Sequence, residues 1–237
     1  KLYKENPERW AEDYTTSLDD VAYSLESIGQ TNEAIELQKE ALEIRKELCK
    51  ENPLRWAENY TSSLNNLADS LSSIERINEA IELEEEALEI IKELYEKDQK
   101  IWQNYYIHNL INLSFLLEDN GKIDEAIEFQ KEALEIRKNL YKENPEIWAE
   151  NYTQSLINLA MSLNQKGKVD EAIVLEKEAL EIRKKLYKEN PKIWAENYTI
   201  ILINLAFSLK NIEKIDEAIK LEKEALEIRK NLYKENP

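Results

Sequence analysis

Residues 145–190 read PEIWAENYTQSLINLAMSLNQKGKVDEAIVLEKEALEIRKKLYKEN, and related stretches occur on both sides of this segment. The period is 46 residues, the constant distance between Trp10, Trp56, Trp102, Trp148 and Trp194. Five repeats therefore fill the chain, at residues 7–52, 53–98, 99–144, 145–190 and 191–236. A fixed period of this size is typical of solenoid proteins, so we expect residues 1–237 to form a single repeat array.

The composition excludes several classes of function. The formal net charge of −17 over 237 residues repels nucleic-acid phosphates and anionic lipid headgroups. With one cysteine (Cys49), one histidine (His108) and no glycine-rich phosphate loop, the chain lacks the usual residues of metal sites and nucleophilic triads. No apolar run approaches the roughly 20 residues that cross a bilayer. We therefore expect a cytoplasmic protein that is not an enzyme and has no cofactor, metal, nucleic-acid or membrane partner.

Each repeat is predicted to form two long helices, which we call helix A and helix B. In the second repeat Asn52 is a favourable N-cap and Pro53 suits the first position of helix A. Apolar residues then recur at helical spacing from Trp56 to Leu71. We expect helix A to end at a left-handed C-terminal cap, at the equivalent positions Gly29, Glu75, Gly121, Gly167 and Glu213.

Helix B is predicted to begin after a capping side chain and to expose a charged face. The expected caps are Asn32, Asn78, Asp124, Asp170 and Asp216. Glutamates follow in the first turn and basic residues such as Arg183 stand in the last, which matches the helix dipole. The Glu and Lys residues in between indicate a solvated outer surface.

The fourth repeat carries apolar and small residues at Leu156, Leu159, Ala160, Leu163, Gly167, Ala172, Ala179 and Leu180, with Asp170 and Glu171 between them. This pattern resembles a tetratricopeptide repeat, and the resemblance covers all five repeats. It implies an all-α, right-handed superhelical solenoid of five antiparallel helix pairs that binds proteins or extended peptides. Three features depart from the family pattern: the period is 46 rather than 34 residues, leucine replaces the aromatic residues of helix A, and Lys184 stands where the terminal proline is expected.

Long-period repeats with a core such as residues 63–68 (SLNNLA) are similar to arrays attached to microbial signal-transducing ATPases and caspase-like proteases. This resemblance implies that the array is the sensor or scaffold part of a larger protein. The sequence opens at Lys1 within the repeating pattern, so we also expect it to be an excerpt of a longer chain.

Two faces of helix A differ between repeats. Leu18, Val21, Ala22 and Leu25 have nearly constant equivalents, which predicts the packing face. A second stripe, at Thr16, Asp19, Asp20 and Tyr23 in the first repeat, varies from repeat to repeat. The family resemblance places a peptide-binding groove on this stripe. Residues 153–165 carry no charge, so we expect a groove that becomes more apolar toward the C-terminal repeats.

One column of the stripe is nearly constant, with asparagine in four of the five repeats. An amide both donates and accepts, so such a column could bind the backbone of an extended peptide, like the asparagine ladders in the arrays of kinesin light chain and O-GlcNAc transferase. Apolar neighbours would then hold the peptide's side chains. The predicted peptide-binding residues are Asn66, Asn112, Asn158, Asn204, Ile111, Phe115, Ile157, Met161, Ile203 and Phe207.

Other interpretations of these residues stay open. The asparagines could bond neighbouring helices, and the stripe could be covered by self-association or by tight closure of the superhelix. A structural or self-assembling array without a dedicated ligand is thus the alternative function. End-to-end association would use apolar residues of the last helix B, at Leu221, Ala225, Leu232 and Tyr233.

Three residue types are interpreted as structural. We expect Trp10, Tyr14 and their equivalents to form the core between repeats. Cys49 stands where the other repeats have tyrosine, which favours a replaceable packing residue. His108 is interpreted as an ordinary groove or surface residue.

Overall fold

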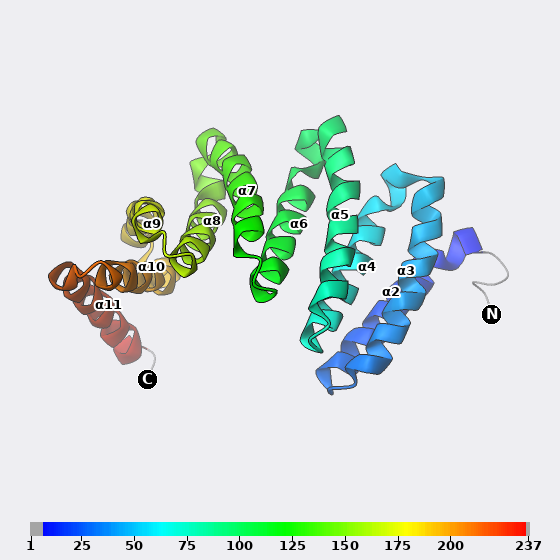
Figure 1. Ribbon diagram of the computed structural model, residues 1–237, viewed down its shortest axis with the longest axis horizontal. Coiled ribbons are helices and arrows are strands. Elements are labelled where there is room, and N and C mark those ends of the chain that lie inside the picture. Colours follow the sequence, from blue (N-terminus) through cyan, green and yellow to red (C-terminus); the bar gives the residue numbers. More distant parts are fainter. Residues whose placement is uncertain (1–6, 236–237) are drawn as a thin grey trace. The chain divides into compact units, whose positions relative to one another are not determined.

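The computed structural model describes the backbone of residues 7–235 and the side chains of residues 9–234. Within that range the chain forms ten α-helices of 21 residues each and no strand (Figure 1). The predicted all-α class, with two helices per repeat, is confirmed. Within the described residues, no helix is long and apolar enough to cross a membrane.

The chain divides into two compact units, Lys1–Lys122 and Ile123–Pro237, and the boundary in the sequence falls within the third repeat. Helices α2, α4, α6, α8 and α10 are the A helices, and α3, α5, α7, α9 and α11 are the B helices. The first unit contains α2 (Pro7–Ser27), α3 (Thr31–Glu51), α4 (Pro53–Ser73), α5 (Ile77–Lys97) and α6 (Gln99–Asp119). The second contains α7 (Ile123–Glu143), α8 (Pro145–Gln165), α9 (Val169–Glu189), α10 (Pro191–Asn211) and α11 (Ile215–Glu235).

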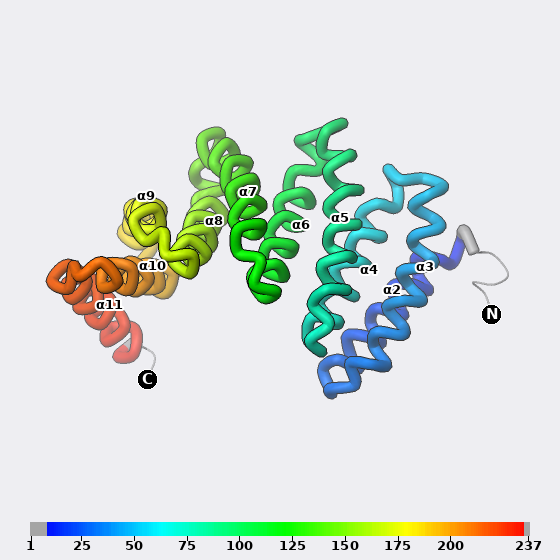
Figure 2. The backbone as a smooth tube through the Cα atoms, viewed as in Figure 1, coloured from blue at the N-terminus to red at the C-terminus, as the bar shows by residue number. Residues whose placement is uncertain are grey.

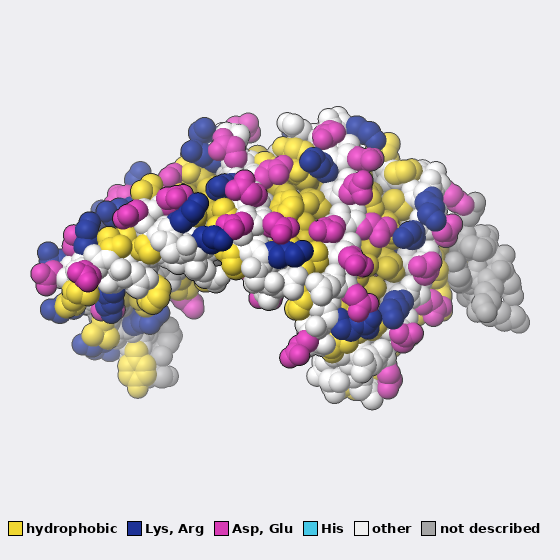
Figure 3. All heavy atoms as spheres, viewed as in Figure 1, with side chains coloured by type: hydrophobic (Ala, Val, Ile, Leu, Met, Phe, Trp, Pro, Cys, Tyr) yellow, Lys and Arg dark blue, Asp and Glu magenta, His cyan; other side chains and the backbone are white. Residues whose placement is uncertain are grey.

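Within each unit, every helix packs against the helix that follows it in the sequence. One residue links helix B to the next helix A, and three residues link helix A to helix B, so the backbone reverses sharply at both kinds of connection (Figure 2). Charged side chains of both signs are interspersed over the B helices that face the viewer in Figure 3. That arrangement agrees with the predicted solvated face of helix B.

Helix A begins at a capping side chain in three repeats, as predicted. The side-chain oxygen of Asn52 accepts a hydrogen bond from the backbone N–H of Arg55, and Asp98 and Asn144 make the same bond in the next two repeats. Asn190 makes no such bond, although Pro191 follows it in the same way. The third repeat has Gln99 at the position of these prolines, and α6 still starts normally because Asp98 caps it.

Helix A ends in a left-handed residue in every repeat, whether or not that residue is glycine. Gly29, Gly121 and Gly167 have φ values of 79°, 77° and 76°, and Glu75 and Glu213 have 64° and 62°. After α4, the N–H of Arg76 bonds the carbonyl of Leu71 and the N–H of Glu75 bonds that of Ser72, at 2.9 Å each. This Schellman motif satisfies carbonyl groups that the helix end would otherwise leave unpaired.

The residues predicted to cap helix B are not its N-cap residues. Helix B starts one residue before each of them, and the N-cap residues Gln30, Arg76 and Lys168 make no side-chain capping bond. The reason is the left-handed turn, which returns the chain directly into helix B: the Ala34 N–H already bonds the Gln30 carbonyl. Asp124 and Asp170 lie in the first turn, where their negative charges interact favourably with the positive end of the helix dipole.

Small residues let helix B approach the A helices on both sides. In the second unit, Ala179 of α9 is fully buried in one cluster with Tyr152 of α8 and Tyr198 of α10. The ring of Tyr187 stacks on that of Tyr198 with centroids 5.0 Å apart, and the Tyr198 hydroxyl donates to Glu224 at 2.7 Å. The predicted role of the repeated tyrosines in the core is confirmed here.

Val21 departs from the predicted packing face. Its side chain is 51% exposed, whereas its equivalents Leu67, Leu113, Leu159 and Leu205 are buried. Leu159 packs with Ile127 of the preceding helix B. Among the described residues no helix precedes α2, so Val21 lacks the neighbour that buries this position in later repeats.

Candidate functional site

The A helices of each unit line a hollow. In the first unit, α4 and α6 enclose about 510 Å³, and we call this space the polar hollow. Its walls carry hydroxyl, amide, imidazole and carboxylate groups. The lining residues are Thr61, Ser62, Asn65, Asn66, Asp69, Asn104, Tyr105, His108, Asn109 and Asn112.

A buried carboxyl supports the wall of the polar hollow. Glu84 of α5 is fully buried, and amide groups of Asn109 and Asn112 donate to its two oxygens at 3.4 Å each. Burial raises the pKa of Glu84 to about 7, and these two hydrogen bonds partly oppose the shift. Burial also raises the pKa of Asp69, while the nearby His108 acts in the opposite direction. The polar hollow therefore has one carboxyl group in its wall, Asp69, and one behind it, Glu84, whose pKa values are raised.

The hollow of the second unit has a different character. Side chains of α8, α9 and α10 enclose about 520 Å³, which we call the apolar hollow because Met161, Ile203 and Phe207 form much of its wall. Met161 and Phe207 are 52% and 60% exposed, so they present apolar surface to solvent. The remaining lining residues are Asn164, Gln165, Glu176, Asn204 and Asn211.

Glu176 is the one titratable residue that lines the apolar hollow among the described residues. Its side chain is only 1% exposed. One carboxylate oxygen, Oε1, accepts from the Ser208 hydroxyl at 2.8 Å and from the Asn164 amide at 3.4 Å. Burial raises the pKa of Glu176 to about 7 despite these bonds. The apolar hollow thus has a carboxyl group at its base that changes charge near neutral pH.

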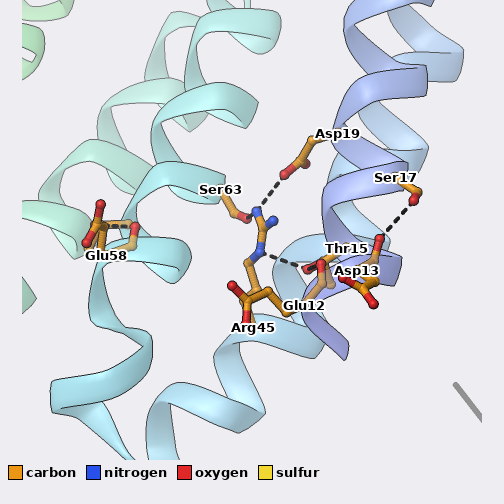
Figure 4. A network of polar contacts seen from close by, with 9 residues as sticks. Glu12, Asp13, Thr15, Ser17, Asp19, Arg45, Glu58 and Ser63 are labelled. Carbon is orange, nitrogen blue, oxygen red and sulfur yellow. Dashed lines mark hydrogen bonds and ion pairs between the residues drawn. The ribbon is translucent and has the colours of Figure 1, made fainter. Parts of the chain in front are cut away.

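Buried arginines connect the A helices beside these hollows. In the first unit the Arg45 guanidinium donates to Thr15 at 3.1 Å, to Asp19 at 2.6 Å and to Ser63 at 2.5 Å, which joins α2, α3 and α4 (Figure 4). Asp19 belongs to the predicted variable stripe, yet its Oδ2 atom is engaged by this ion pair. That position of the first repeat therefore has a structural partner.

Arg183 is the residue of the fourth repeat that is equivalent to Arg45, and it lies in the second unit. It donates to the Thr153 hydroxyl at 3.1 Å, to the Gln154 side chain at 3.2 Å and to the Asn197 carbonyl at 2.8 Å. Its side chain is 2% exposed, so its sequence-based assignment to the charged last turn of helix B missed the main role of this residue. Burial lowers the pKa of Arg183 to about 10, and the nearby Glu150 partly opposes that shift.

Six of the ten predicted peptide-binding residues line the two hollows. The polar hollow includes Asn66 and Asn112, and the apolar hollow includes Met161, Ile203, Asn204 and Phe207. Phe115 is 45% exposed and Ile111 is half-buried, but neither is among the residues that line these two hollows. The predicted change from polar to apolar surface toward the C-terminal repeats matches the residues of the two hollows.

Ile157 does not belong to a binding wall. Its side chain is 3% exposed and packs in the cluster that joins α8, α9 and α10. Its equivalents Ile111 and Ile203 are half-buried, and the variation between repeats at this position misled the prediction. Ile157 is a core residue.

The predicted asparagines differ in their contacts. Asn112 Nδ2 lies 3.4 Å from Glu84 and 3.2 Å from the His108 ring, and Asn158 Oδ1 accepts from Gln154 at 2.8 Å. Asn66 is exposed and Asn204 is half-buried. Asn112 therefore bonds a neighbouring helix through Glu84, as in the structural interpretation, whereas Asn158 bonds Gln154 within its own helix. Asn66 and Asn204 line the hollows.

The sequence-based prediction missed the inner polar stripe of helix B. In the first repeat, Ala34, Gln38, Ala41 and Arg45 of helix B are all buried. Spacings of four, three and four residues put all four on one helix face. The nearly invariant alanines could have identified this face, and with it Glu84 and Glu176 at the positions equivalent to Gln38.

Helix pairs that pack in sequence and hollows lined by A helices define an α-solenoid repeat protein. Models of the tetratricopeptide repeat match residues 105–185 in one case and residues 15–53, 61–99 and 200–237 in another. The chain belongs to the tetratricopeptide repeat family. Arrays of this family are typically non-catalytic modules for protein–protein interaction.

Several solved structures have the same fold. BtubC (BKLC) from P. vanneervenii has a TM-score of 0.77 at 23% identity, and the match covers 100% of this chain and 87% of that one. The kinesin light chain TPR-like repeats of Podosopora anserina, described as putative, have a TM-score of 0.73 at 24% identity, with coverages of 96% and 98%. MamA from Desulfovibrio magneticus RS-1 has a TM-score of 0.57 at 11% identity, with coverages of 92% and 97%. No curated protein matches the sequence of the chain. These identities are low, so the likeness concerns the fold alone.

Proposed function

We propose that this chain is a recognition module that binds an extended peptide segment of a partner protein along the A helices, as the sensor or scaffold part of a larger protein. The observation that carries this proposal is the pair of hollows of about 510 and 520 Å³, each lined by A helices. Hollows of that size take side chains and short peptide segments.

The chemistry of the hollows supports a peptide rather than a small charged metabolite. Amides such as Asn66 and Asn204 donate to and accept from a peptide backbone without selecting its sequence. The exposed side chains of Met161 and Phe207 add apolar surface that selects among residues of the partner. The amides would therefore supply affinity for the peptide backbone, and the apolar side chains would supply selectivity for the peptide's side chains.

A selection from a random peptide library displayed on phage tests the proposal with the full chain as bait. We expect enriched peptides to bind with measurable affinity by calorimetry. Replacing Asn66 and Asn204 together with Ala should weaken binding at least about tenfold, because each lost hydrogen bond in a desolvated site costs about 1 to 3 kcal/mol. Circular dichroism should show unchanged helix content, since neither side chain is buried.

The matched control is Lys185→Ala, which removes an exposed side chain from helix B. Binding by this variant should equal that of the parent chain. If the double asparagine variant binds as tightly as the parent, or if Lys185→Ala is the change that abolishes binding, the A helices are not the recognition surface.

A self-assembling array is the second candidate function, and exposed apolar residues of α11 favour it. Ile219 and Leu226 are 39% and 53% exposed, although their equivalents Ile173 and Leu180 in α9 are buried or half-buried. Leu221, Ala225 and Leu232, which the sequence suggested for this role, pack into the second unit instead; Tyr233 is the exposed member, at 72%. Growth of the sedimenting particle with concentration, abolished by Leu226→Glu, would favour assembly.

A further inference from the structure

The carboxylate of Glu176 is incompletely satisfied. Its Oε1 atom has two hydrogen-bond donors, but its Oε2 atom is buried and has none. A buried carboxylate without a counter-ion is costly unless a donor or a cation compensates it. The contacts of Glu176 within the described chain are the Ser208 hydroxyl and the Asn164 amide, both neutral. Glu176 therefore lacks a positive partner.

Asn164, beside Glu176, also has a buried oxygen atom without a hydrogen-bond donor. Asn164 uses its Nδ2 atom to donate to Ser208 at 2.7 Å and to Glu176 at 3.4 Å, which leaves its Oδ1 atom buried without a partner. Both residues line the apolar hollow. The base of the hollow thus has two acceptors without donors and, when Glu176 is ionised, one negative charge without a counter-ion. An ammonium group supplies three donors, one positive charge and no acceptor.

The fifth repeat has its own lysine at this place. Lys210 and Glu222 stand 46 residues beyond Asn164 and Glu176, and the Lys210 Nζ atom lies 2.5 Å from Glu222 Oε1. The fourth repeat has Asn164 at the position of Lys210, so Glu176 has no lysine partner of this kind. The first and third repeats have the neutral Gln38 and Gln130 at the glutamate position.

The second repeat compensates its glutamate in another way. Glu84 Oε2 lies within hydrogen-bond distance of the Asn109 amide and Glu84 Oε1 within that of the Asn112 amide. Each of its oxygens therefore has a donor. Among the described glutamates of this column, Glu176 is the buried one with an unpaired oxygen.

We propose that the apolar hollow is a subsite for a lysine side chain of the partner peptide, with the ammonium group bound by Glu176 Oε2 and Asn164 Oδ1. The aliphatic part of the lysine would lie along Met161, Ile203 and Phe207, as long basic side chains do on apolar surfaces. This inference rests on the proposed function, because it assigns one residue of the peptide to one hollow. Both oxygens are buried in the free chain, so a side chain at the base of the hollow rotates when the ammonium group enters.

Hexylammonium chloride and 1-hexanol are suitable probes, since they share a six-carbon chain and differ in charge. We titrate each into the full chain and follow the side-chain amides of Asn164 and Asn204 and the methyl group of Met161 by NMR. The ammonium compound should bind at least about tenfold more tightly than the alcohol, because hydrogen bonds between charged groups are stronger than those of a neutral hydroxyl. Equal affinities would overturn the proposal and leave a hollow for apolar groups only.

Two variants locate the effect. Glu176→Gln introduces the residue that the first and third repeats carry, and it should abolish the preference for the ammonium compound. Asn164→Lys imitates Lys210 of the fifth repeat, and its own ammonium group should exclude the probe. The control is Glu222→Gln, whose carboxylate is already paired with Lys210, and it should bind the probe as the parent does. Unchanged affinity in Glu176→Gln would contradict the proposal.

The probe experiment is independent of the peptide selection. Capture of peptides through the A helices without any preference for hexylammonium would retain the recognition function and eliminate the lysine subsite. A clear ammonium preference without captured peptides would retain the subsite chemistry and count against an extended peptide as the ligand.

Discussion

Glu75 and Glu213 occupy backbone conformations that glycine adopts more easily. Their φ values of 64° and 62° lie in the left-handed region, where the side chain approaches the following carbonyl. The other three repeats have glycine at this position, and a Cβ built on those glycines meets no atom within 4 Å. A side chain therefore has room at this position of those three repeats, so the cost of a non-glycine residue lies in the backbone conformation.

Glu75→Gly should raise the free energy of unfolding by about 1 kcal/mol, because the strain of a non-glycine residue in this region exceeds the entropy that glycine adds to the unfolded chain. Urea denaturation followed by circular dichroism measures this change. The reverse substitution Gly121→Glu should lower the free energy of unfolding by a similar amount. A Glu75→Gly variant that is less stable than the parent would show that the glutamate side chain has a stabilising contact.

The buried carboxyls predict a dependence of stability on pH. Burial raises the pKa of Glu84 and Glu176 from 4.5 to about 7. The folded chain then holds these protons more tightly than the unfolded chain, so the stability linked to each group is complete below pH 4.5 and is lost as the pH rises through about 7. Glu176→Gln should therefore stabilise the chain more at pH 8.5 than at pH 6, by about 1 kcal/mol.

Urea denaturation of parent and variant at both pH values measures this difference. The control is Glu82→Gln, which removes the same charge from an exposed position of α5 and should show no such pH dependence. If Glu176→Gln and Glu82→Gln respond alike, the effect is one of net charge rather than burial.

For individual helices, the sequence predicted most of the helix boundaries but fewer of the contacts between helices. Proline and the capping residues Asn52 and Asn144 identified the start of helix A, because a cap is a local interaction within four residues. The start of helix B was predicted two residues late, since a left-handed turn replaces the side-chain cap there. The burial of Ile157 and Glu176 depends on helices that come before and after them in the sequence, which one helix's pattern does not specify.

The packing of α3 on α4 differs from the equivalent packing in later repeats. Tyr95, Tyr141 and Tyr187 each stack on a tyrosine of the next helix A, with ring centroids 4.7 to 5.0 Å apart. Cys49 stands at this position in the first repeat and is 7% exposed. A hollow of about 370 Å³ lies beside it, lined in part by Tyr60 of α4. The missing aromatic ring accounts for this space.

Cys49→Tyr should fill that hollow and stack on Tyr60, raising the free energy of unfolding by about 1 kcal/mol. Chemical denaturation of the two proteins in the presence of a reductant measures the change. Tyr141→Cys is the matched control in the second unit and should destabilise the chain by a comparable amount or more. A destabilised Cys49→Tyr variant would mean that the side chains of α3 and α5 around the hollow do not admit the ring.

For the whole molecule, repetition made the class of fold predictable. Five copies of one pattern put the same leucines and alanines on the same faces, so an error in one repeat is corrected by the other four. The candidate site depends on the residues that differ between repeats. Met161 and Phe207 were found because the variable stripe of helix A carries them, whereas Glu176 lies in a helix whose charges suggested only a solvated face.

The contacts of a solenoid are mainly between neighbouring helices, so damage to one end should stay local. Residues 1–190 lack α10 and α11, and their removal uncovers the face of α9 that packs with Leu205 and Ala206 through Ile173. We expect amide hydrogen exchange in this shortened chain to accelerate most in α8 and α9 and least in α2 and α3. Mass spectrometry of peptic fragments measures the change helix by helix, with residues 53–237 as the mirror-image control that should expose α4 first. Equal acceleration in every helix of the shortened chain would instead mean that the five repeats unfold as one cooperative body, and stability would then not be a sum of local interfaces.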